Sequence, residues 1–169
     1  MKLASLEAIV RSLNDGGVRY LIAGGLAVNA HGYIRLTLDV DLVIALDSAN
    51  IARAFQTLAR LGYKPIVPIT AEQFADAELR RQWIRDKGMT VLNFFSDLHR
   101  ETTLDMFVTE PFDFQRESTH ALEGELSPGV IVRFVSLPTL IAMKEAAKRP
   151  RDIDDVQHLR WTKENKPDE

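Results

Sequence analysis

The sequence contains no cysteine, no long hydrophobic run and no strong excess of one charge. Without cysteine it can form no disulfide, use no thiol nucleophile and build no thiolate zinc site. No stretch approaches the roughly 18 consecutive apolar residues of a membrane-spanning helix, so no membrane segment is expected. A net charge of -3 argues against a broad nucleic-acid-binding face, although it is compatible with a local basic patch.

The remaining composition is that of a globular domain. Its 169 residues are 46% hydrophobic and 27% charged, which predicts one domain with one core. We expect this domain to cover residues 1–162 and a polar tail to follow over 163–169. Glu7 stands where a signal peptide would be apolar, so a cytoplasmic protein is expected.

Hydrophobic periodicity and turn residues divide the chain into alternating helices and strands. The expected helices cover about 3–13, 26–31, 48–61, 71–86, 137–149 and 152–161. The expected strands cover about 18–23, 37–45, 63–69, 89–95, 102–108 and 130–135. The segment 111–129 gives only weak signals. This order predicts an α/β (α+β) domain built on one mixed sheet flanked by helices.

Two carboxylates at the start of an apolar strand are the strongest chemical signal. Asp39 and Asp41 are two residues apart, so in a strand their side chains share one face and lie about 7 Å apart. Two like charges on one face of a core strand repel each other, so a protein rarely places them there without a cation to neutralise them. Gly24-Gly25 forms a turn that a phosphate can approach closely, although such a turn alone is weak evidence. Together these features predict metal-assisted phosphoryl or nucleotidyl transfer.

A third carboxylate interrupts a later apolar strand. Asp105 lies within Thr103-Leu104-Asp105-Met106-Phe107, where an isolated charge is anomalous. If this strand is a neighbour of the strand of Asp39 and Asp41, three carboxylates converge. The alternative interpretations are a solvated strand edge for the first two and a surface position or salt bridge for Asp105.

The combined pattern resembles the DNA polymerase β-like nucleotidyltransferase superfamily, in particular its small prokaryotic members similar to AbiEii-type toxin nucleotidyltransferases. The resemblance covers about residues 18–160. It rests on the following segments: Gly24-Gly25, Arg35-x-Thr37-x-Asp39-x-Asp41, Leu104-Asp105-Met106-Phe107, and Lys144 followed by Arg149-Pro150-Arg151-Asp152-Ile153-Asp154-Asp155.

The resemblance implies a nucleotidyltransferase fold and a set of site residues. As metal ligands it implies Asp39, Asp41 and Asp105, holding Mg²⁺ or alternatively Mn²⁺. As contacts of a nucleoside triphosphate it implies Gly24, Gly25, Arg35, Thr37 and Lys144. The implied reaction moves a nucleoside monophosphate to an acceptor hydroxyl of RNA, a protein or a small molecule. A toxin role with an antitoxin protein as partner is also implied.

Two departures keep other functions open. Many members of the superfamily have a serine where this chain has Gly25, and the chain is shorter than typical toxins of that branch. A second hypothesis is therefore a catalytically silent protein of this fold that binds a nucleotide or a partner protein. A third is a metal-dependent phosphohydrolase, which would use the same acids with water as the acceptor.

Several charged residues also have structural interpretations. Arg35 is equally consistent with a counter-charge for an aspartate and with phosphate binding. Lys144 lies on the apolar stripe of its helix, and we expect it to reach into a cleft. We expect Asp152 to be a helix N-cap, with Asp155 completing an imperfect capping box. The four histidines show no metal-binding spacing.

Overall fold

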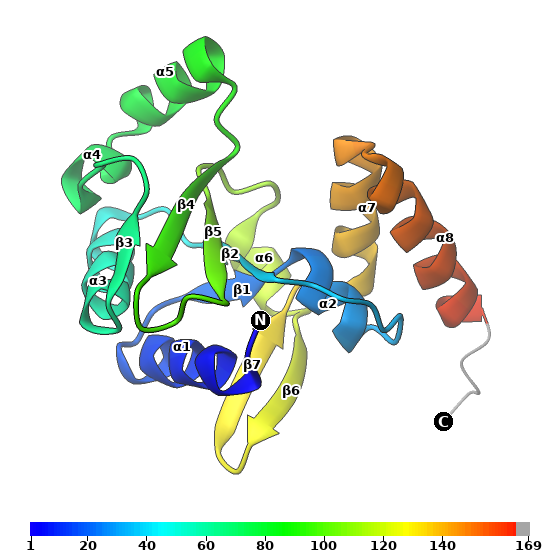
Figure 1. The fold of residues 1–169 in the computed structure, drawn as a ribbon. Helices are drawn as coiled ribbons and strands as arrows, with labels where there is room; N and C mark the ends of the chain where they lie inside the picture. Colours follow the sequence, from blue (N-terminus) through cyan, green and yellow to red (C-terminus); the bar gives the residue numbers. More distant parts are fainter. Residues whose placement is uncertain (165–169) are drawn as a thin grey trace.

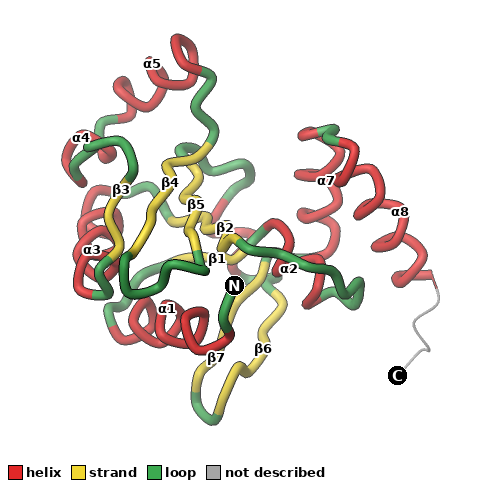
Figure 2. The backbone as a smooth tube through the Cα atoms, in the orientation of Figure 1, coloured by secondary structure: helices red, strands yellow, loops and turns green. Residues whose placement is uncertain are grey.

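A seven-stranded mixed sheet runs through the protein in the order β3-β4-β5-β2-β1-β7-β6 (Figures 1 and 2). The structure is a computed structural model, and it describes residues 1–164. The strands are β1 (Tyr20–Ile22), β2 (Asp39–Ile44), β3 (Tyr63–Pro65), β4 (Val91–Ser96), β5 (Thr103–Phe107), β6 (Leu122–Ser127) and β7 (Val130–Phe134). The predicted mixed sheet is confirmed: β2 is parallel to β5 and β1 to β7, while the other neighbours are antiparallel.

Helices flank this sheet (Figure 1). They are α1 (Leu3–Asp15), α2 (Gly24–Ala30), α3 (Ser48–Arg60), α4 (Ala71–Ala75), α5 (Ala77–Lys87), α6 (Phe114–Ser118), α7 (Leu137–Ala147) and α8 (Pro150–Glu164). Helices α1 and α3 contact each other and the strands, and α7 packs along α8 as a helical pair that stands at one side of the sheet (Figure 1). No helix within residues 1–164 is both long and apolar enough to cross a membrane.

The core of the sheet explains the position of the carboxylates. Strand β1 is buried along its whole length, whereas β2 is exposed at Asp39 and becomes buried toward Ile44. Val40 and Leu42 point into the core, and the alternation of a strand sends Asp39 and Asp41 to the other face. The sheet therefore presents the beginning of its central strand to a surface pocket.

Several element boundaries differ from the expected ones. Helix α2 begins at Gly24, so the two glycines form its first turn and do not precede it. The predicted helix over 71–86 is two helices, because Asp76 caps a second helix directly after Ala75. Within the weak segment 111–129, the structure contains the whole of α6 and β6. Their short lengths leave little periodicity to recognise.

The C-terminal helix also differs from the expectation. Helix α8 starts at Pro150, so Asp152 lies inside its first turn and is not its N-cap. A proline suits the first helical position because the N–H that it lacks would have no intrahelical partner there. The helix continues to Glu164, past the expected end near Trp161 and into the predicted tail. The rest of that tail, 165–169, lies outside the described residues.

Candidate active site

The three aspartates lie on two parallel neighbouring strands. Asp41 of β2 is directly opposite Asp105 of β5, and Asp39 is opposite Thr103. The Thr103 hydroxyl donates a hydrogen bond of 2.5 Å to Asp39 Oδ1. The register therefore brings together the three carboxylates that the sequence singles out.

Asn93 is a site residue that the sequence analysis missed. It lies on β4 opposite Asp105, and its side-chain amide donates a hydrogen bond of 2.7 Å to Asp105 Oδ1. In sequence, Asn93 is a polar residue on the exposed side of an alternating strand, which is an ordinary pattern. Only the pairing of β4 with β5 reveals that it orients Asp105.

The environment of Asp41 and Asp105 disfavours their ionised forms. Burial, together with the charges of Asp105 and Asp39, raises the pKa of Asp41 to about 6, although Lys144 and the Gly25 backbone N–H act in the opposite direction. Burial also raises the pKa of Asp105, against the hydrogen bond from Asn93. A cation in this position would relieve both effects.

The donor chemistry of this group fits a hard divalent cation, since all three candidate ligands are carboxylates. No group of three carboxylate or imidazole residues within 1–164 is arranged to hold a metal ion as it stands. The fold thus places the three aspartates at adjacent register positions but does not by itself form a complete coordination sphere. The assignment of Asp39, Asp41 and Asp105 as metal ligands remains a prediction.

Gly24 makes room for the Asp41 side chain, and Gly25 makes room for Thr37 and Arg35. Gly24 has φ +60°, and a Cβ built on it would lie 1.8 Å from Asp41 Oδ2. A Cβ on Gly25 would lie 2.5 Å from Thr37 Oγ1. Any larger residue at either position would displace its neighbours, so the two glycines are required by the protein's own packing, whether or not a phosphate approaches them.

A buried ion-pair network borders the carboxylates. Arg35 Nε and Nη2 donate to the two oxygens of Asp155, at 2.6 and 2.8 Å. Lys144 Nζ lies 2.7 Å from Asp155 Oδ2 and 2.9 Å from Asp152 Oδ1. The Asp155 side chain is fully buried; burial alone would raise its pKa, but the hydrogen bonds from Arg35 and Lys144 outweigh burial and lower it.

This network shows the counter-charge role of Arg35, which was one of its two interpretations. Arg35 is the counter-charge of an aspartate, but that aspartate is Asp155 and not a member of the strand pair. Asp152 accepts hydrogen bonds from Lys144 and from the Arg149 backbone N–H, in place of the predicted N-cap role. Lys144 is buried but reaches a cleft, as predicted. Phosphate contacts by Arg35, Thr37 and Lys144 remain a prediction.

One pocket of about 250 Å³ joins all of these features. It is lined by Gly24, Gly25, Arg35, Thr37, Asp39, Asp41, Asp105, Phe107, Leu140, Met143, Lys144, Ala147, Arg149, Arg151 and Asp152. All eight residues that the sequence nominates are among them. The others are apolar residues of α7 and the end of β5, which give no distinctive signal in a single sequence, and Arg149, Arg151 and Asp152 around the start of α8, which belong to a segment of the family resemblance.

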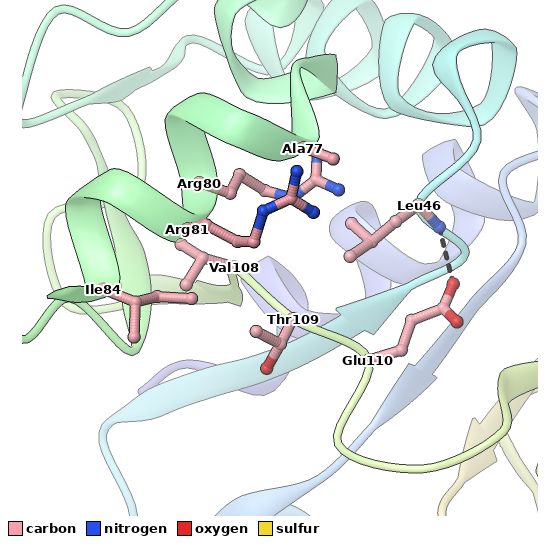
Figure 3. Close-up of a pocket in the computed structure, with 8 residues that line it drawn as sticks. All are labelled: Leu46, Ala77, Arg80, Arg81, Ile84, Val108, Thr109 and Glu110. Atoms are coloured by element: carbon pink, nitrogen blue, oxygen red, sulfur yellow. Dashed lines mark hydrogen bonds between the residues drawn. The ribbon is translucent and has the colours of Figure 1, made fainter.

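A larger pocket of about 420 Å³ lies between α5 and the residues that follow β2 and β5 (Figure 3). Its charged groups are engaged with protein partners: Arg81 pairs with Glu78, and Glu110 accepts a hydrogen bond from the Leu46 N–H. Arg80 donates to the Phe74 carbonyl. No predicted site residue lines this pocket, so the smaller one is the candidate active site.

Comparison with solved structures identifies the fold. Lincosamide antibiotic adenylyltransferase LnuA, solved with lincomycin, is similar with a TM-score of 0.56 and 14% identity over 88% of this chain and 89% of that one. ANT(2")-Ia, solved with adenylyl-2"-tobramycin, gives a TM-score of 0.58 and 13% identity over 93% and 86%. An antigenic nucleotidyltransferase-like protein from Paracoccidioides brasiliensis gives 0.57 and 17% over 93% and 74%.

These similarities show that the chain has the fold of nucleotidyltransferases, as the sequence predicts. The sequence matches no protein-family model, and no curated protein matches it. The identities are low, so the likeness extends to the fold, and the chemistry must be argued from the pocket.

Proposed function

We propose that the protein is a nucleotidyltransferase that moves a nucleoside monophosphate from a nucleoside triphosphate to an acceptor hydroxyl. The observation that carries this proposal is the convergence of Asp39, Asp41 and Asp105 beside the Gly24-Gly25 turn in one pocket. The structural similarity to two adenylyltransferases supports it. In the proposed reaction the acceptor oxygen bonds to the α-phosphorus, the bond to the β-phosphate breaks, and pyrophosphate leaves.

Asp39, Asp41 and Asp105 would hold Mg²⁺, with Mn²⁺ as a substitute. A bound divalent ion would neutralise the carboxylates and polarise the phosphoryl oxygens. Asp105, whose pKa is raised by burial, is suited to accept the proton of the attacking hydroxyl. Asn93 orients Asp105 for this role. The reaction is otherwise a matter of positioning and charge neutralisation.

The triphosphate would lie between the glycine turn and the basic junction of α7 and α8. Lys144, Arg149 and Arg151 line that side of the pocket, and the side chain of Arg149 is 77% exposed. The Arg149 guanidinium lies 3.7 Å from Asp152 and is mostly exposed, so it can turn to phosphate oxygens more readily than the buried Lys144. RNA, a protein and a small molecule all remain proposed acceptors, and a toxin role with an antitoxin remains part of this proposal.

Thermal unfolding with each ribonucleoside triphosphate, with and without Mg²⁺, tests the site. A ligand that binds only the folded state raises Tm according to RT ln(1 + [L]/Kd). We expect a Mg²⁺-dependent rise in the wild type that is lost in the Asp39→Asn/Asp41→Asn variant. An equal rise in that variant, or one independent of Mg²⁺, would contradict the proposal.

Pyrophosphate release separates the enzyme from a silent binding protein. The assay uses labelled nucleoside triphosphate with RNA, lincomycin or tobramycin as candidate acceptors. Label transfer that Asp105→Asn abolishes is the expected result. Triphosphate binding without product from any acceptor favours the silent protein, and metal-dependent hydrolysis without an acceptor favours the phosphohydrolase.

A further inference from the structure

The candidate pocket has one wall that the proposed chemistry does not use. This apolar wall consists of Phe107, Leu140, Met143 and Ala147. Phe107 lies two residues after Asp105 on β5, so it shares the face of the carboxylates. Leu140, Met143 and Ala147 repeat at helical spacing on α7, where they form one face together with Lys144.

The placement of Lys144 ties the apolar wall to the rest of the pocket. The positive charge of its ammonium group lowers the pKa of Asp41. On the same face of α7, Met143 and Ala147 line the pocket beside it. A ligand whose phosphates lie near the carboxylates would therefore extend its other end along the wall. Phe107 and Met143 are only partly buried, so their side chains remain available to such a ligand.

We propose that the apolar wall stacks the nucleobase of the donor nucleoside triphosphate and does so without reading its identity. This inference rests on the proposed function, because it supposes that the phosphates lie at the glycine turn. An aromatic ring stacks on any base, since every base has a π face. Phe107 supplies that ring, and Met143 supplies a flexible apolar contact beside it.

The polar groups around the wall explain the absence of base selection. Recognition of a particular base requires side-chain donors or acceptors directed at its edge. Among the described residues that line the pocket there is no asparagine, glutamine, serine, tyrosine or histidine. Arg35, Lys144 and Asp152 are engaged in the ion-pair network, and Arg151 donates a hydrogen bond of 2.6 Å to the Leu36 carbonyl. The remaining cation of the lining, Arg149, is the one assigned above to the phosphate oxygens. Thr37 lies against Gly25, on the side of the turn.

The test compares the four ribonucleoside triphosphates with inorganic tripolyphosphate, which has phosphates but no base. Dissociation constants are derived from thermal unfolding or calorimetry with Mg²⁺ present. We expect the four triphosphates to bind within about tenfold of one another, and each to bind about tenfold or more tightly than tripolyphosphate, on the scale of one stacking contact.

Two phenylalanine variants locate the effect. Phe107→Ala should weaken all four triphosphates by about tenfold while leaving tripolyphosphate unchanged. Phe95→Ala is the matched control: Phe95 lies on the neighbouring strand β4, is 40% exposed and does not line the pocket. Its removal should change neither affinity. Phe107→Leu keeps more of the packing and should weaken the triphosphates less than Phe107→Ala.

The outcomes separate this inference from the proposed function. If neither the triphosphates nor tripolyphosphate bind with Mg²⁺, the proposed function fails, and the inference fails with it. If triphosphates bind no better than tripolyphosphate, or if Phe107→Ala leaves their affinity unchanged, the stacking role is wrong while the proposed function stands. If one triphosphate is preferred by far more than tenfold, the absence of base reading is wrong.

Discussion

Two charged clusters meet at the same pocket, which Arg35, Lys144 and Asp152 of one cluster line together with all three aspartates of the other, and their charges are arranged differently. The ion-pair network joins Arg35, Lys144, Asp152 and Asp155, so two positive groups meet two negative ones at 2.6 to 2.9 Å. The carboxylate cluster joins Asp39, Asp41 and Asp105, whose direct hydrogen bonds come from neutral groups. The charges of the network are paired within the protein, whereas those of the carboxylate cluster face one another without a basic side chain hydrogen-bonded to them.

This difference separates stability from function. The network links the 33–38 loop to α7 and α8, which are more than 100 residues away in the sequence. Arg35 and Asp155, for example, are 120 residues apart. The network therefore fixes the walls of the pocket. In the carboxylate cluster the charge of Asp41 opposes folding, because burial and repulsion by Asp105 and Asp39 raise its pKa to about 6. Removing the charge of Asp155 and removing the charge of Asp41 should therefore shift stability in opposite directions.

The largest effect is expected from Asp155→Asn. This change leaves the buried Arg35 and Lys144 short of a negative partner, and removal of one member of a buried pair costs about 3–5 kcal/mol. The free energy of unfolding, measured with a denaturant, should fall by that amount. Asp154→Asn is the matched control, because the Asp154 side chain is 50% exposed and its loss should cost at most about 1 kcal/mol. Similar losses in both variants would show that the network does not stabilise the fold.

Acid should reduce the advantage of the wild type over Asp155→Asn. The pKa of Asp155 is lower in the folded protein than in the unfolded chain, so its ionised form favours folding. That contribution is fully present above the unfolded pKa of about 3.9 and is lost as the pH falls through the lower folded pKa. Unfolding curves of both proteins from pH 7 to pH 2 should therefore converge at the acid end. A difference that stays constant over this range would contradict the pKa direction.

Gly24→Ala should disturb the carboxylate cluster through sterics. The new Cβ would meet not only Asp41 Oδ2 but also Asp41 Cβ, at 2.9 Å, so the backbone must shift. Gly17→Ala provides the matched control, since Gly17 has φ +62° but open space around it. The strained backbone alone costs about 1–2 kcal/mol in both variants. We expect Gly24→Ala to lose more stability than Gly17→Ala, and equal losses would show that Asp41 yields freely.

Asp41→Asn should have the opposite sign in the absence of metal. With chelator present at pH 7, removing a charge whose folded pKa is raised to about 6 should stabilise the protein by about 1–2 kcal/mol. Asp39→Asn, on the same strand but exposed, should change the free energy of unfolding much less. Loss of stability in Asp41→Asn would show that the carboxylate is already neutralised within the protein.

The two clusters also differ in how far the sequence predicts them. Asp39, Asp41 and Asp105 are visible in sequence because a charge inside a strand-like apolar run is unusual, and strand alternation then fixes their common face. The network is only half visible. Lys144 stands out on an apolar helix face, but the spacing of Asp152 and Asp155 fits a helix cap as well as an ion pair. No local pattern in the sequence predicts that Arg35 pairs with Asp155.

The missed elements have the same cause. Asn93 and the apolar wall gain their roles from which strands pair and how α7 crosses the pocket, and these are long-range facts that a single sequence does not encode in local patterns. Asp76, in contrast, carries a local signal: a capping residue after a short helix marks a new one. The charged helical pattern continues across Asp76, which masks this signal in the sequence.

The smallest effect on stability is expected from Asn93→Ala, at the edge of the carboxylate cluster. Asn93→Ala removes the amide that donates to Asp105, and both groups are partly solvated, so the free energy of unfolding should change by less than about 1 kcal/mol. Because Asn93 only orients the proposed metal ligand Asp105, its removal should instead weaken Mg²⁺ binding, on the order of tenfold for such supporting partners. Titration of Mg²⁺ against the thermal stability of the triphosphate complex measures this change. Asn93→Gln keeps the amide on a longer side chain and should recover part of the Mg²⁺ affinity. Full Mg²⁺ affinity in Asn93→Ala would instead show that Asp105 needs no support from β4. The carboxylate cluster would then be positioned by β2 and β5 alone.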